Sequence, residues 1–122
     1  MPRILLDQSA PLGLRRVLTG HEVKTAYEMG WDRMANGRLL DAAEGAGFDI
    51  LVSSDQGLWH QQNLTGRRIA VVILTTNHWD TIRTDLSAVV AACAGAGEGS
   101  YTVVRFPLPP RRRRPPPAPF SP

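Results

Sequence analysis

The stretch ILVSSD at residues 50–55 decides the fold of this chain, together with its counterpart ILLD at residues 4–7. Each stretch is a short apolar run that ends in an aspartate. Uninterrupted apolar strands are typical of a parallel sheet that helices cover on both faces. In open α/β sheets, ligands bind at the carboxyl ends of the strands. If the two strands are parallel neighbours, Asp7 and Asp55 therefore face one crevice.

Two carboxylates that lie close together repel each other, and a divalent cation relieves that repulsion. Magnesium held by carboxylates usually serves phosphate chemistry. We therefore take Asp7 and Asp55 as candidate catalytic residues and as candidate ligands of Mg²⁺ or Mn²⁺. The structural alternative is that each aspartate only caps a turn, since aspartate favours turns and accepts backbone hydrogen bonds.

The composition indicates one domain that does not span a membrane. The chain has 122 residues, of which 43% are hydrophobic, and it has no apolar run near the roughly 20 residues that a membrane helix needs. We see no secretory pattern near residue 1, and Cys93 is the only cysteine. These features predict a cytoplasmic protein without a disulfide, in which Cys93 is a small buried hydrophobic residue.

The basic character of the chain belongs to its last residues. Four of the fourteen Lys and Arg residues form the run Arg111 to Arg114, and the other ten nearly balance the eleven acidic residues. We expect a domain over residues 1–106 and a disordered, Pro/Arg-rich tail over residues 107–122. The arginine run can attract phosphate backbones or an acidic partner, or it can simply be solvated.

Apolar periodicity and turn residues predict strands that alternate with helices, with Asn36 as an N-cap. The predicted strands cover residues 2–6, 21–26, 48–52, 69–74 and 101–106, and the predicted helices cover residues 12–18, 37–45, 58–64 and 79–94. This alternation is typical of an α/β fold with a mostly parallel sheet.

Several segments resemble the PIN-like domains, a small bacterial group related to VapC-type toxin nucleases. They are ILLDQSAP, GHEVKTAYEMGW, NGRLLDAAEGAGFDILVSSDQGL and QQNLTGRRIAVVILTTN, in that order, and the resemblance covers roughly residues 3 to 104. The resemblance implies a three-layer α/β/α sandwich with a mostly parallel central sheet. It also implies a metal-dependent ribonuclease that acts on RNA as the toxin of a toxin–antitoxin pair. The same resemblance implies an antitoxin protein as partner and a homodimeric state.

The chain departs from the PIN-like pattern at two positions. Gln8 follows Asp7 where relatives often have glutamate, and Asn36 stands where many relatives carry an acid. A full PIN nuclease gathers three or four carboxylates. The candidates for the additional acids are Glu22, Glu28 and Asp41. The departures leave open a second function, that of a catalytically weak or inactive PIN-like module that binds RNA or a partner protein.

Three further residues are candidates for positioning the substrate. Ser54 could donate a hydrogen bond to a phosphate or a metal-bound water, Asn77 follows the strand at 69–74, and Trp59 could stack on a base. Each has a structural alternative, as a residue that satisfies backbone groups, lies in a loop or packs in the core. His60 could act as a general base, although a solvent-facing position suits it better.

A third class, the phosphoacceptor receiver domain, also has aspartates after its first and third strands. Thr75 or Thr76 could be the threonine that receivers carry after the fourth strand. Receivers also need paired acids after the first strand and a lysine after the fifth. Gln8 and the position of the single lysine, Lys24, argue against this class.

Overall fold

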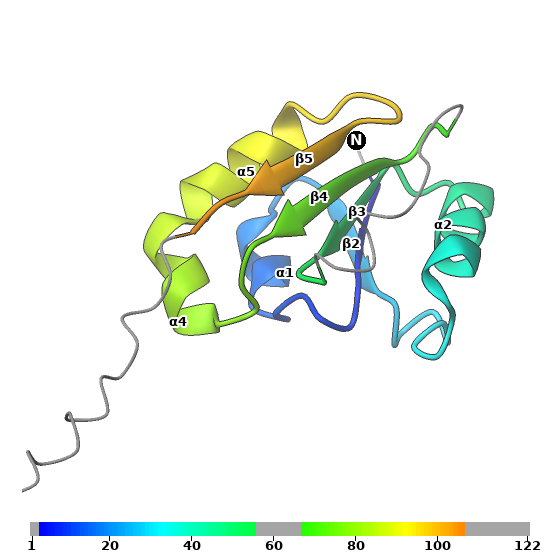
Figure 1. Ribbon diagram of the computed structural model, residues 1–122, viewed down its shortest axis with the longest axis horizontal. Helices are drawn as coiled ribbons and strands as arrows, with labels where there is room; N and C mark the ends of the chain where they lie inside the picture. Colours follow the sequence, from blue (N-terminus) through cyan, green and yellow to red (C-terminus); the bar gives the residue numbers. More distant parts are fainter. Residues whose placement is uncertain (1–2, 56–66, 107–122) are drawn as a thin grey trace, which may run out of the picture.

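A five-stranded sheet, in which every neighbouring pair of strands is parallel, forms the centre of the protein (Figure 1). The computed structural model describes residues 3–55 and 67–106. The strands are β1 (Arg3–Leu6), β2 (Glu22–Thr25), β3 (Ile50–Ser53), β4 (Ala70–Leu74) and β5 (Tyr101–Val104). They lie in the order β2-β1-β3-β4-β5. The predicted α/β fold with a parallel sheet is confirmed.

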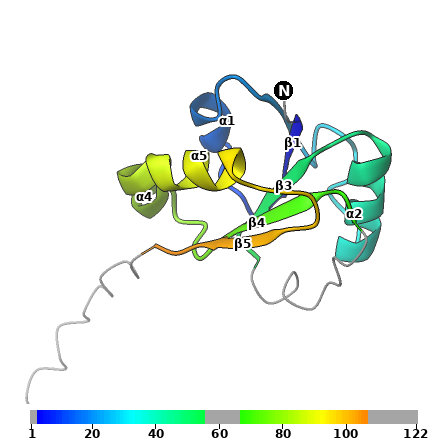
Figure 2. The same cartoon turned by 90° about the horizontal axis from the view of Figure 1, so that it is seen from above.

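Helices pack on both faces of this sheet, which is why the three central strands are apolar over residues 4–6, 50–52 and 70–74. The described helical segments are α1 (Leu14–Val17), α2 (Asn36–Gly45), α4 (Trp79–Ile82), the 3₁₀ turn η1 (Arg83–Asp85) and α5 (Leu86–Ala94). Figure 2 shows α1, α4 and α5 together on one side of the sheet, apart from α2. Successive strand residues point to opposite faces, so Leu5 belongs to one core cluster while Leu6 belongs to the other.

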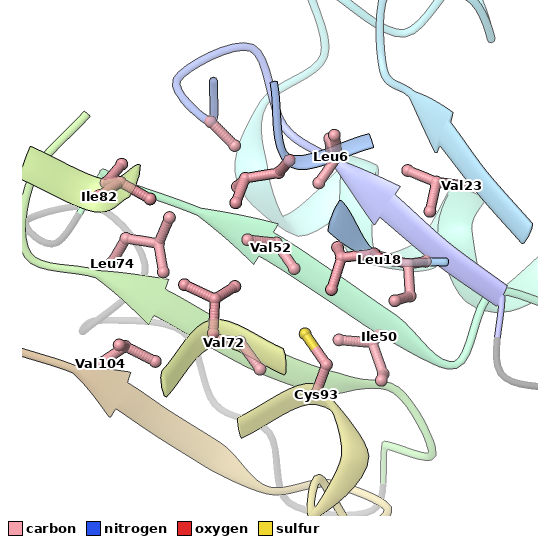
Figure 3. Close-up of a cluster of buried hydrophobic side chains, with 14 of the residues drawn as sticks. Leu6, Leu18, Val23, Ile50, Val52, Val72, Leu74, Ile82, Cys93 and Val104 are labelled. Carbon is pink, nitrogen blue, oxygen red and sulfur yellow. The ribbon is translucent and has the colours of Figure 1, made fainter. Parts of the chain in front are cut away.

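The first core cluster fills the space between the sheet and α1, α4 and α5 (Figure 3). Leu6, Val52 and Val72 from three neighbouring strands are fully buried there. Cys93 of α5 joins them with 2% of its surface exposed. Burial raises the pKa of its thiol to about 11, so the thiol stays protonated at neutral pH. This confirms that Cys93 is a buried hydrophobic residue.

The second core cluster lies on the other face, between the sheet and α2. Leu39 and Leu40 of this helix pack with Leu51 of the central strand, and all three are almost fully buried. Trp31 and Phe48 meet edge to face at the side of the cluster, with ring centroids 6.0 Å apart. The connection from β2 to α2, residues 26–35, passes the carboxyl ends of the strands before the chain enters α2.

Three predicted helices differ from those in the structure. The predicted helix at 12–18 is shorter in the structure, because α1 covers only Leu14–Val17. The predicted helix at 79–94 is interrupted by η1, because local side-chain bonds compete with the helical backbone there: the Thr84 hydroxyl donates to the Thr81 carbonyl at 2.6 Å, and Asp85 leaves the helical region at φ −145° and ψ 61°. Helix α2 begins at Asn36 with Ala35 as its N-cap, and no side-chain cap bond is made. The predicted helix at 58–64 and the tail at 107–122 lie outside the described residues.

The close approach of α4 to the start of α1 requires a glycine. The indole of Trp79 lies against Gly13, where a Cβ would come within 2.6 Å of the ring. Trp79 is half-buried and packs against the first core cluster. Together these contacts link α4 to the segment that follows Asp7, on the edge of the sheet where the strands end.

The strand order contains a switch point between β1 and β3. The chain leaves β1 toward β2 on one side, whereas β4 follows β3 on the other side. Diverging connections of this kind leave a crevice at the carboxyl ends of the two strands, and ligands of doubly wound sheets bind there. Asp7 and Asp55 are the acids that follow these two strands.

None of the helices in residues 3–55 and 67–106 is both long enough and apolar enough to cross a membrane.

Candidate functional site

Asp7 and Asp55 line one pocket at the switch point, as the paired strand ends predicted. Asp7 follows β1 directly, and its backbone N–H donates to the Val52 carbonyl of β3 at 2.9 Å. Asp55 lies two residues beyond the end of β3. Their shared pocket has a volume of about 400 Å³. Its lining residues are exposed or half-buried, so solvent reaches it. We call it the acidic pocket.

A buried serine connects the two aspartates. The hydroxyl of Ser53 donates to Asp7 Oδ2 at 2.8 Å and accepts a hydrogen bond from the backbone N–H of Asp55 at 3.1 Å. Ser53 is fully buried at the end of β3, so its rotamer is fixed by packing as well as by these bonds. One hydroxyl group therefore orients the Asp7 carboxylate and holds the Asp55 backbone beside it.

Two further serines, Ser9 and Ser54, join the loop after β1 to the end of β3. The Ser54 backbone N–H donates to Ser9 Oγ at 3.0 Å, and the Ser54 hydroxyl donates to the Ser9 carbonyl at 2.6 Å. Ser9 Oγ also lies 3.0 Å from Ser53 Oγ and 3.3 Å from Asp7 Oδ2. Ser54 was predicted to position the substrate; its proton is engaged by the backbone, so its hydroxyl has only acceptor capacity left for a ligand.

The carboxylate oxygens of the acidic pocket suit a hydrated divalent cation. Asp7 Oδ2 faces the serines, while Oδ1 accepts from the Gln8 backbone N–H at 2.7 Å. Each carboxylate oxygen has two acceptor directions, so Oδ1 retains one beyond the bond from Gln8. Carboxylate and water oxygens suit Mg²⁺ and Mn²⁺, and Mg²⁺ is commonly held by one or two carboxylates.

The pocket is not a ready-made cage of three protein ligands. Among the described residues, no group of three or more His, Cys, Asp or Glu side chains is placed to hold a metal ion. A cation here would therefore keep several of its waters and rest on Asp7 and Asp55.

The structure adds one acid that the sequence did not single out. Asp32 lines the acidic pocket with Asp7 and Asp55, from the loop that joins β2 to α2. The available signal was topological: after a parallel strand, the chain must pass the carboxyl edge of the sheet before it returns through a helix. An acid in that loop, such as Asp32, was therefore a stronger candidate than an acid within the strand or the helix.

Two of the additional acid candidates lie away from the acidic pocket, in ion pairs near the start of the strands. Glu22 begins β2 and pairs with Arg3 at 3.0 Å. Asp41 of α2 pairs with Arg67 at 2.8 Å, and Arg67 also binds Glu44 at 2.9 Å. The hydrogen bonds that Arg67 donates to Glu44 and Asp41 raise the pKa of its guanidinium. Arg67 is therefore a half-buried member of this cluster of charges.

Glu28, the remaining candidate, lies near Asp7 but is held by other partners. Its carboxylate pairs with Arg15 at 2.8 Å. It also accepts from the Thr25 backbone N–H, while the Thr25 hydroxyl accepts from the Glu28 backbone N–H. The bond from Arg15 is the largest cause of the lowered pKa of Glu28. Glu28 and Arg15 thus form part of the wall of a second pocket, of about 530 Å³, that also includes Asp7.

The other predicted site residues do not enlarge the acidic pocket. Asn77 is exposed in the segment after β4. The Thr75 hydroxyl accepts from the Phe106 backbone N–H at 2.8 Å, which joins the ends of β4 and β5. Trp59 and His60 lie outside the described residues.

Fold and site together define a doubly wound α/β protein with an acidic pocket at its switch point. Comparison of the chain with models of protein families, with curated proteins and with solved structures finds no match.

Proposed function

We propose that this protein is a ribonuclease of PIN-like type that depends on Mg²⁺ or Mn²⁺. The observation that carries the proposal is the placement of Asp7 and Asp55 in one pocket at the carboxyl ends of two neighbouring parallel strands. The sequence resemblance favours RNA as the substrate. A role as the toxin of a toxin–antitoxin pair, with an antitoxin partner, a homodimeric state and a cytoplasmic location, belongs to the same proposal.

The residues of the acidic pocket have separable tasks in this proposal. A bound Mg²⁺ or Mn²⁺ would stabilise negative charge on the scissile phosphate and lower the pKa of a bound water. Asp7 and Asp55 would supply the carboxylate ligands. Ser53 fixes the Asp7 carboxylate at 2.8 Å and the Asp55 backbone at 3.1 Å, so that little reorganisation is needed on binding. Asp32 would accept hydrogen bonds from the remaining metal-bound waters.

The experiment that tests this function is cleavage of a labelled single-stranded RNA by the full chain. We expect cleavage with Mg²⁺ or Mn²⁺ and none with excess EDTA, because phosphate-ester cleavage here relies on the cation. Gel electrophoresis of the products after a time course measures the rate. Cleavage that is equal with and without EDTA would show a different mechanism or a contaminating nuclease.

A second candidate function is a binding module without catalysis. It is favoured by the lack of a three-ligand metal group among residues 3–55 and 67–106, and by Gln8 in place of an acid next to Asp7. Such a module would bind RNA or a partner protein without a metal. RNA binding in EDTA, together with no cleavage under any of the metal conditions, would decide for this candidate.

A further inference from the structure

Exposed apolar side chains gather around Asp7. Leu12, Tyr27 and Met34 are the large hydrophobic residues with substantial exposure in the described part of the chain, at 69%, 75% and 37%. All three line pockets that include Asp7: Met34 lines the acidic pocket, whereas Leu12 and Tyr27 line the second pocket. Apolar surface that is concentrated in one place commonly marks a binding site.

The second pocket adjoins the acidic pocket through shared residues. Asp7 and Gln8 line both pockets. Leu12 comes from the turn before α1 and Tyr27 from the turn after β2, so the second pocket is an apolar extension of the acidic pocket along the carboxyl edge of the sheet. A molecule whose reacting group lay beside Asp7 would place its neighbouring group between Leu12 and Tyr27.

The chemistry of this extension suits a nucleobase. Tyr27 offers an exposed aromatic ring, and every base has a face that stacks on such a ring. The wall also carries the Arg15–Glu28 ion pair, whose polar atoms can meet the edge of a base. Arg33 is exposed and forms no ion pair with a described residue. It stands in the sequence between Asp32 and Met34, which line the acidic pocket, and a guanidinium near such a site can bind a phosphate.

The size of the apolar surface argues against a protein partner at this position. A stable protein interface takes roughly 20–30 residues on each side, whereas the apolar part of this pocket is essentially two side chains. A single stacked base needs no larger surface than that.

We propose that Tyr27 and Leu12 form a base-binding subsite for single-stranded RNA, in which the base of a nucleotide next to the scissile phosphate stacks on the Tyr27 ring. This inference rests on the proposed function, because it takes Asp7 to be the position of the phosphate. Tyr27 is a positioning residue: it holds the RNA strand and takes no part in the bond cleavage.

The test is the affinity for a fluorescently labelled single-stranded RNA, measured by anisotropy in the Asp55→Asn background so that the RNA stays intact. Tyr27→Ala is expected to weaken binding by about 10-fold, within the range of one base–aromatic contact. Tyr27→Phe keeps the ring and is expected to bind within about twofold of the background protein, because stacking needs the ring face and not the hydroxyl. Leu12→Ala, on the other wall, should weaken binding by about threefold, as the loss of part of an apolar contact.

Three results would overturn the subsite. The first is equal RNA affinity with Tyr27→Ala and with Tyr27→Phe, and the second is an absence of RNA binding by the background protein. The third is a dimer in sedimentation that Tyr27→Ala converts to a monomer, which would make this surface a subunit interface.

Failure of the subsite can be told apart from failure of the proposed ribonuclease. Loss of RNA affinity with Tyr27→Ala in a protein that never cleaves RNA supports the subsite and rejects the enzyme. Metal-dependent cleavage with RNA binding that is indifferent to Tyr27 supports the enzyme and rejects the subsite.

Discussion

Asp7→Asn is expected to reduce metal-dependent RNA cleavage by about 100-fold or more. Replacing the carboxylate by an amide removes the negative charge that would hold the proposed cation. A bound metal is worth several kcal/mol of transition-state stabilisation, at about tenfold per 1.4 kcal/mol. Asp55→Asn should have an effect of the same order, because the two residues face the same pocket. Initial rates on labelled RNA at saturating Mn²⁺ measure both variants.

Asp80→Asn is the matched control for these two substitutions. Asp80 is exposed and pairs with Arg83 at 3.3 Å within α4 and η1, and an exposed pair of this kind contributes about 0–1 kcal/mol to stability. Its variant should cleave RNA at the wild-type rate. Circular dichroism melting of all three variants separates a loss of the metal site from a loss of the fold.

Asp32→Asn tests how much the acid that the structure adds to the site contributes to RNA cleavage, relative to Asp7. Since Asp32 would contact metal-bound waters and not the cation itself, its variant should lose less activity than Asp7→Asn. Full cleavage by both Asp7→Asn and Asp55→Asn would contradict the assigned site, whatever the effect at Asp32.

Leu51→Ala is expected to destabilise the protein by about 2–5 kcal/mol, the range for truncating a buried leucine. Leu51 is fully buried in the second core cluster, on the central strand between Leu5 and Val71. Truncation leaves a cavity that the neighbouring strands and α2 cannot readily fill. Urea unfolding, followed by circular dichroism, measures the free energy of unfolding.

Leu12→Ala is the control for Leu51→Ala, since it makes the same chemical change at a leucine that is 69% exposed. An exposed substitution of this kind usually changes stability by less than about 0.5 kcal/mol. Equal destabilisation by the two variants would contradict the burial of β3 between two helical layers.

The fold could be predicted from the sequence because the composition of its central strands indicates that both of their faces are buried. Residues 4–6, 50–52 and 70–74 are apolar at every position, as strands covered on both faces must be, and the structure buries all of them. The interruption of the helix at 79–94 was not predictable from periodicity, because Ile82 before η1 and Leu86 after it keep the helical spacing of the apolar stripe. It depends on the bond from Thr84 to Thr81 and on the conformation of Asp85.

The site was predictable only in part, for a physical reason that its residues illustrate. The placement of Asp7 and Asp55 follows from strand direction, which the apolar runs reveal. The roles of Glu22 and Asp41 depend on Arg3 and Arg67, which are 19 and 26 residues away in the chain, and no local pattern identifies such partners. The bond from Ser53 to Asp7 likewise exists only once β1 and β3 are neighbours.

The central claim is that Asp7 and Asp55 form a cation site at the switch point, and Mn²⁺ binding followed by electron paramagnetic resonance tests it most directly. Titrating the full chain with Mn²⁺ should remove the signal of free Mn²⁺ with a stoichiometry of about one ion per chain, as expected for one site with two carboxylate ligands. Asp7→Asn should abolish this binding, whereas Asp80→Asn should preserve it. Absence of binding at millimolar Mn²⁺, or equal affinity in the wild-type protein and Asp7→Asn, would contradict the claim.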